Sequence, residues 1–68
     1  MSASRWVHLE ECSVKAVTER AILVEYDSEE FWFPLSQVSE GDQYEKGDEG
    51  VTISVTEWIA DQKGIDHD

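Results

Sequence analysis

Residues 13–26 read SVKAVTERAILVEY, and this stretch decides the fold. It holds two runs rich in β-branched residues, 13–17 and 21–26, which are typical of strands. The residues between them, Thr18-Glu19-Arg20, are few enough for a tight connection. The stretch therefore predicts a β-hairpin.

Alternating apolar and polar residues extend the strand pattern on both sides of this hairpin. In residues 6–10, Val7 and Leu9 face one side and the intervening residues face the other, and residues 51–55 alternate in the same way. A turn at 27–30 leads into the aromatic run 31–33, which should end at a sheet edge or bulge because Pro34 cannot donate a backbone hydrogen bond.

The C-terminal part changes to a helical pattern. Ser54 and Thr56 compete as N-cap residues, so a helix should begin near 55–57 with Trp58 as its main apolar anchor. Gly64 suits the left-handed position after the helix, and Ile65 should fold back onto the last turn. The predicted fold is mainly β (α+β): about five short antiparallel strands in a strongly bent sheet or small barrel, with one C-terminal helix. The expected core comprises Val7, Leu9, Val14, Ala16, Ile22, Val24, Phe31, Phe33, Leu35, Val38, Val51, Ile53, Trp58 and Ile59.

A chain of 68 residues allows one domain, with little room for a deep pocket. We expect a flexible leader at 1–5, an acidic loop at 36–50 and a frayed tail at 66–68. Cys12 is the single cysteine, which excludes an internal disulfide and suits a reducing compartment. The chain shows neither a signal-peptide core nor an apolar run of the roughly 20 residues that span a bilayer, so a cytoplasmic location is expected.

The charge is distributed very unevenly. The net charge is −11, and residues 25–50 alone hold nine acidic residues against one base, Lys46, a net charge of −8. Such a field repels nucleic acid and acidic membranes and attracts basic protein surfaces. The acidity also fits a solubility role or the proteome of a salt-adapted organism. Neither monomer nor dimer is favoured.

The acidic segment supplies the predicted partner-binding residues. Glu25, Asp27 and Glu29 are expected along one strand edge at intervals of about 6.6 Å, a series of anions suited to a phosphate-binding groove. Trp32 and Tyr44 are expected to be exposed aromatic side chains among carboxylates, as in a protein-binding hot spot, whereas most other rings should be core. The complete predicted set is Glu25, Asp27, Glu29, Glu30, Trp32, Asp42, Tyr44, Glu45, Asp48 and Glu49.

No catalytic, cofactor or metal motif stands out. Cys12 and His8 lie about 13 Å apart if they share one strand, too far for a nucleophile and base pair, and Cys12 is expected to be a packing residue. A calcium loop starting at Asp42 fails because Lys46 and Ile53 occupy ligand positions, which leaves only weak divalent binding by the acidic loop. Too few cysteines and histidines exist for structural zinc.

Two segments carry a resemblance, the aromatic-x-Pro-x-Ser-Gln pattern at 32–37 and the Glu-Trp-x-Ala-x-x-Lys-Gly pattern at 57–64. With them, most of residues 14–65 resembles small acidic proteins encoded by bacteriophages and mobile elements. This resemblance implies a phage context and no catalytic residues.

Three functions remain open. The first is a non-enzymatic protein that engages the basic surface of a nucleic-acid-handling protein, as nucleic-acid-mimicking inhibitors of the anti-CRISPR or anti-restriction type do. The second is an accessory module of phage replication or recombination that binds a protein through an edge strand and Trp32. The third, a small-barrel binder of single-stranded DNA, lacks the positive groove that such proteins use.

Overall fold

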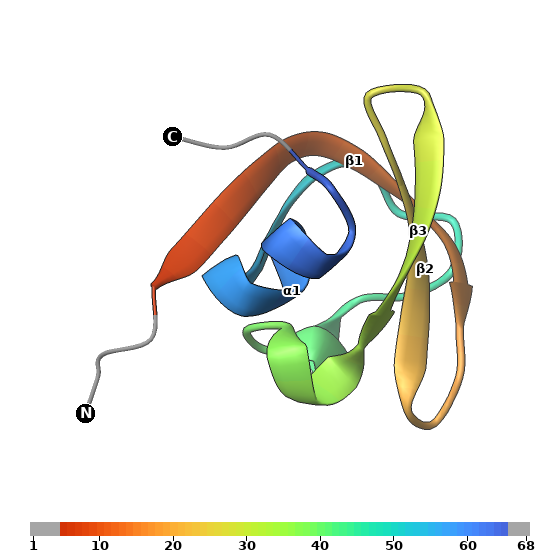
Figure 1. The fold of residues 1–68 in the computed structure, drawn as a ribbon. Helices are drawn as coiled ribbons and strands as arrows, with labels where there is room; N and C mark the ends of the chain where they lie inside the picture. Colours follow the sequence, from red (N-terminus) through yellow and green to blue (C-terminus); the bar gives the residue numbers. More distant parts are fainter. Residues whose placement is uncertain (1–4, 66–68) are drawn as a thin grey trace.

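The computed structural model describes residues 5–65, which form one antiparallel sheet followed by a short helix (Figure 1). The strands lie in the order β3-β2-β1-β4, and helix α1 follows β4 directly and contacts β4 and β1. The mainly β fold with a C-terminal helix is therefore confirmed. The elements are β1 (Trp6–Val17), β2 (Ala21–Tyr26), β3 (Glu29–Pro34), the 3-10 turns η1 (Leu35–Gln37) and η2 (Gly41–Gln43), β4 (Glu49–Thr56) and α1 (Glu57–Gln62).

The predicted hairpin is present as β1 and β2. Val14 pairs with Val24 and Val17 with Ile22. The Thr18 backbone N–H donates to the Ala21 carbonyl at 2.8 Å, and the Thr18 hydroxyl accepts from the Ala21 N–H at 3.0 Å. Thr18 thus closes the connection with both its backbone and its side chain.

The prediction of five strands is not confirmed, because residues 6–10 and 13–17 belong to one strand. The first part of β1 pairs with β4 and the last part with β2, with Ser13 paired to both. The pairing register shifts on both sides of Cys12, and Glu11 has a φ of 57°. These irregularities let β1 redirect its side chains without ending the strand. Across the described residues, the sheet is not closed into a barrel.

The core differs from the predicted one mainly in its aromatic residues. Phe33 is fully buried, whereas Phe31, Tyr26 and Tyr44 are half-buried and pack against the core. Ala16, Leu35 and Val51 are also only partly buried. The buried set is Val7, Leu9, Cys12, Val14, Ile22, Val24, Phe33, Val38, Ile53, Val55, Ile59, Ala60 and Ile65.

The helix is anchored by residues other than Trp58, so that prediction is wrong. Trp58 is 59% exposed, and the buried side of α1 consists of Ile59 and Ala60. Thr56 is the N-cap, since its hydroxyl accepts from the Ile59 N–H at 3.2 Å.

The end of the helix follows the prediction. Gly64 has a φ of 73°, and its N–H donates to the Asp61 carbonyl at 3.1 Å. The Ile65 N–H donates to the Ala60 carbonyl at 2.9 Å, which completes a Schellman motif and buries Ile65 against the core. Residue 5, part of the predicted leader, is tied to the helix because the Arg5 carbonyl accepts from the Glu57 N–H at 2.9 Å. The rest of that leader and the predicted tail at 66–68 lie outside the described residues.

The predicted loop at 36–50 is fastened to the sheet. The Gly47 N–H donates to the Val14 carbonyl at 2.9 Å, and the Ser39 N–H donates to the Ser54 carbonyl at 2.8 Å. Its last two residues already belong to β4. Gly41 is buried, and a Cβ there would lie 2.9 Å from the Leu35 Cδ2 atom, so a larger residue would displace the Leu35 side chain.

Candidate functional site

The acidic segment begins at the β2–β3 hairpin. Asp27 and Ser28 form its two-residue turn, with φ angles of 54° and 66°, as in a type I′ turn. Glu25 and Glu29 therefore lie on opposite strands, where Glu25 pairs with Glu30 and Glu29 pairs with Tyr26. The predicted series along a single strand edge is wrong, because the chain reverses at Asp27.

The structure instead aligns Glu25 with two other carboxylates across the sheet. Ser13 in β1 pairs with Glu49 in β4 on one side and with Glu25 in β2 on the other, and Glu25 pairs with Glu30 in β3. Paired residues on neighbouring strands point to the same face, and neighbouring strands lie about 4.8 Å apart. We call Glu25, Glu30 and Glu49 the acidic row.

One cation offsets part of this charge. Lys15 Nζ lies 3.2 Å from Glu25 Oε1, and both side chains are partly exposed, so the ion pair contributes at most about 1 kcal/mol. Glu25 and Glu30 face each other across β2 and β3, an arrangement that disfavours folding unless a cation lies nearby. Within residues 5–65, neither Glu30 nor Glu49 makes an ion pair. The acidic row therefore keeps two uncompensated charges in solvent.

An apolar row lies next to the acidic row. Ala16, Leu23 and Trp32 are paired across β1, β2 and β3, and Leu23 and Trp32 stand two residues from Glu25 and Glu30 on their strands. Because strand side chains alternate with a period of two, both rows belong to the same face. Trp32 is 45% exposed, as predicted, and β3 is an edge strand of the sheet.

The remaining predicted residues lie in or beside the loop. Asp42 and Glu45 are exposed, and the Asp48 carboxylate accepts a hydrogen bond from the Glu45 N–H at 2.9 Å. The Asp48 carbonyl accepts from the Val14 N–H at 2.7 Å, which brings the loop close to the acidic row. Among residues 5–65, no group of three or more acidic, histidine or cysteine side chains is arranged to hold a metal ion.

Tyr44 is not the freely exposed aromatic that the sequence suggested. Its ring is half-buried against the core, and its hydroxyl donates to the Thr52 carbonyl at 3.0 Å. Burial, together with the negative charge of Glu40, raises the pKa of Tyr44 above its usual value. This residue fastens the loop to β4.

Sequence reasoning missed two further exposed tryptophans. Trp6 is 43% exposed and Trp58 is more exposed still. The alternation in residues 6–10 already placed Trp6 opposite Val7 and Leu9, so this strand pattern was the available signal. With Trp32, all three tryptophans of the chain therefore present large apolar surface to solvent, a property common at protein-binding surfaces.

Cys12 and His8 do not form a reactive pair. Cys12 is fully buried, and its thiol donates to the Leu9 carbonyl at 3.2 Å, as expected for a packing residue. His8 is exposed, with its Nδ1 atom 2.6 Å from the Ser54 hydroxyl. Burial raises the pKa of the Cys12 thiol from 9.0 to about 11, outweighing a hydrogen bond from the Ile53 backbone.

We expect Cys12 to make stability fall at alkaline pH. The unfolded chain loses this proton near pH 9 and the folded protein only near pH 11, so the contribution is complete below pH 9 and is lost as pH rises towards 11. The expected loss is about 2 kcal/mol, with a further loss from Tyr44 in the same direction. Urea unfolding at pH 8 and pH 11 measures it. Cys12→Ala should reduce the fall in the free energy of unfolding between pH 8 and pH 11. An equally large fall in this variant would show that Cys12 is not its cause.

The comparisons with known proteins found no relative. No protein-family model matches the chain, and no curated protein or solved structure matches it. In residues 5–65, no helix has the length and apolar character needed to cross a membrane. The site therefore has to be interpreted from its own geometry and charge.

Proposed function

We propose that the chain is a non-enzymatic interaction protein that engages the basic surface of a nucleic-acid-handling protein. The acidic row is the observation that carries this proposal, because Glu49, Glu25 and Glu30 present carboxylates in line across four strands. With strands about 4.8 Å apart, the row forms a linear series of negative charges, as a phosphate backbone does. A groove that binds phosphates can accept such a series.

The proposed effect is competitive inhibition of nucleic-acid binding by mimicry. The resemblance to small phage proteins supports a phage origin, and with it an anti-CRISPR or anti-restriction role in the host cytoplasm. The net charge of −8 in residues 25–50 attracts a basic partner electrostatically, which raises the rate of association. The loop residues Asp42, Glu45 and Asp48 extend this field beyond the acidic row.

A second function is favoured by the edge position of β3. Trp32 is exposed beside Leu23 on the outer face, and an edge strand can pair with an extended segment of another protein. The chain would then be an accessory module of phage replication or recombination. Pro34 would limit such pairing to the earlier part of β3.

Capture from a bacterial lysate tests these two functions. The immobilised chain should retain a nucleic-acid-binding protein at 50 mM salt and release it steeply as salt rises, because screened charges no longer attract. Retention that is insensitive to salt but is lost with Trp32→Ala would favour the edge-strand contact. A captured protein without any affinity for nucleic acid would contradict the mimicry proposal.

We expect no measurable binding of DNA by the chain itself near physiological salt. Its field opposes phosphate, and its acidic row lies beside the exposed ring of Trp32 where a stacking site would need cations. Fluorescence anisotropy with single-stranded and duplex oligonucleotides measures this. Micromolar binding would contradict the proposal and would favour direct binding of nucleic acid instead.

A further inference from the structure

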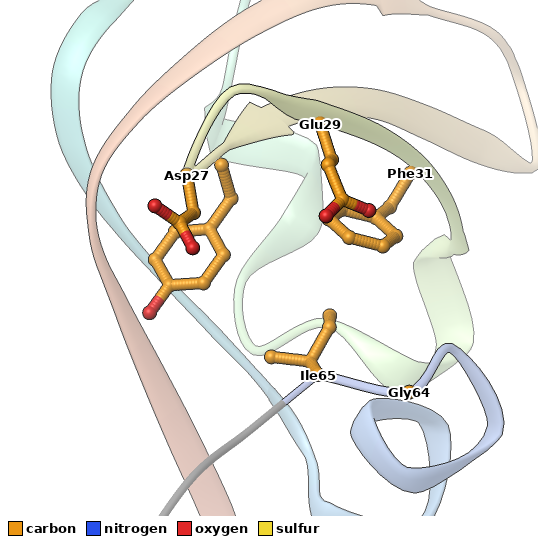
Figure 2. Close-up of a pocket in the computed structure, with 6 residues that line it drawn as sticks. Asp27, Glu29, Phe31, Gly64 and Ile65 are labelled. Carbon is orange, nitrogen blue, oxygen red and sulfur yellow. The ribbon is translucent and has the colours of Figure 1, made fainter.

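A small hollow lies between the tip of the β2–β3 hairpin and the end of α1 (Figure 2). Its volume is about 140 Å³. Asp27, Glu29 and Phe31 line it from the hairpin, and Gly64 and Ile65 line it from the chain after the helix. Tyr26 completes the wall. The hollow thus joins two segments that are far apart in sequence.

The hollow lies on the inner face of β3, opposite the acidic row. Glu29, Phe31 and Phe33 alternate onto one face of the strand, and along it Phe33 is fully buried, Phe31 is half-buried and Glu29 is exposed. The ring centroids of Phe31 and Phe33 are 6.0 Å apart, so the aromatic wall continues into the core. The hollow is therefore the solvent-facing end of the core, with carboxylates at its rim.

We propose that this hollow binds a lysine side chain of the basic partner. The inference rests on the proposed function, because it names a second contact with the same basic partner, on the face of β3 opposite the acidic row. The lining holds two carboxylates, two aromatic rings and no cation. An ammonium group is attracted both to carboxylates and to the faces of aromatic rings.

Lysine fits better than the other basic side chain. Its charge is a compact ammonium on a flexible apolar stem, and the stem can pack on Phe31 and Ile65 while the ammonium reaches Asp27 and Glu29. The guanidinium of arginine is instead a planar fork of five donors, which is suited to bidentate pairing with a single carboxylate. The wall is fixed, since the Ile65 N–H is bonded to the Ala60 carbonyl and Asp27 lies in a two-residue turn.

The test uses the tripeptide acetyl-Gly-Lys-Gly-amide as probe and acetyl-Gly-norleucine-Gly-amide as its uncharged control. In ¹⁵N NMR titrations of the full chain, the lysine peptide should shift the amides of residues 26–31 and 64–65, and the norleucine peptide should not. Equal shifts with both peptides would overturn the proposal, as would shifts confined to the acidic row around Glu25, Glu30 and Glu49.

A matched pair of variants separates the hollow from the overall charge. The double variant Asp27→Asn with Glu29→Gln should bind the lysine peptide at least about fivefold more weakly, because both carboxylates of the hollow are lost. Asparagine tolerates the positive φ of position 27, so the turn should persist. Glu45→Gln with Glu49→Gln removes the same charge elsewhere and should change binding less than about twofold. Equal weakening by both variants would overturn the proposal.

The result of the peptide titration does not depend on any partner protein. Failure of the peptide to bind would remove the lysine contact and leave the acidic row as an interface. Conversely, the proposed function would fail if the captured protein did not bind nucleic acid, even where the peptide titration succeeded.

Discussion

Phe33→Ala is expected to destabilise the protein by about 3 to 5 kcal/mol. Phe33 is fully buried, pairs with Ile22 across β2 and β3 and packs against the Phe31 ring. Removing a buried aromatic side chain costs about 3 to 5 kcal/mol. A chain of this length has a total stability of roughly 3 to 10 kcal/mol, so that cost is a large share of it. Urea unfolding followed by circular dichroism measures the change.

Trp58→Ala provides the matched control for this prediction. Although tryptophan is the larger residue, Trp58 is mostly exposed on α1, and its loss should cost less than about 1 kcal/mol. A loss of stability with Trp58→Ala as large as that with Phe33→Ala would show that the helix packs through Trp58. The core described above would then be wrong.

Reversing two charges of the acidic row is expected to slow partner binding at least about tenfold at low salt. Glu30→Lys with Glu49→Lys replaces the two members of the row that make no ion pair within residues 5–65. Electrostatic steering raises association rates by factors of 10 to 10³, so inverting the local field should act mainly on the association rate. Stopped-flow or surface plasmon resonance with the captured partner at 50 mM salt measures this rate.

The control variant carries the same net charge. Glu10→Lys with Glu19→Lys adds the same four charge units, so both variants have a net charge of −7 instead of −11. Both control positions are exposed and outside the acidic row, and this variant should lose much less than tenfold. Equal slowing in the two variants would show that only net charge matters. An unchanged rate in the first variant would place the interface elsewhere, such as around Trp32.

The fold was predictable where local patterns decide it. The hairpin of residues 13–26 and the helix cap at Gly64 follow from β-branched runs and from the backbone freedom of glycine. The sequence pattern predicted residues 6–10 and 13–17 as separate strands, with the alternation interrupted at Glu11 and Cys12. The interruption is instead an irregularity within β1, because backbone pairing with β4 resumes at Cys12.

The side of α1 that faces the core was harder to predict. A six-residue helix makes less than two turns, so periodicity could not decide whether Trp58 or Ala60 accompanies Ile59 towards the core. The short step from β4 into α1, fixed by the Thr56 cap, decides it and turns Ala60 inward. From side-chain size alone, Trp58 was the expected anchor of the helix.

The candidate site was predictable in composition but not in arrangement. The sequence identified the acidic segment and Trp32, yet the acidic row depends on the register of β4 against β1. That register joins strands distant in sequence and shifts on both sides of Cys12, so counting residues could not place Glu49 beside Ser13. The hollow at Asp27 and Glu29 depends in the same way on where Ile65 packs.

Competition with nucleic acid tests the central claim most directly. The captured partner is titrated with the chain in the presence of increasing amounts of its own nucleic-acid ligand. If the acidic row occupies a phosphate-binding groove, the apparent affinity should fall in proportion to the nucleic acid present, and no ternary complex should form. A stable ternary complex with unchanged affinity would contradict the proposal that this chain acts as a nucleic-acid mimic.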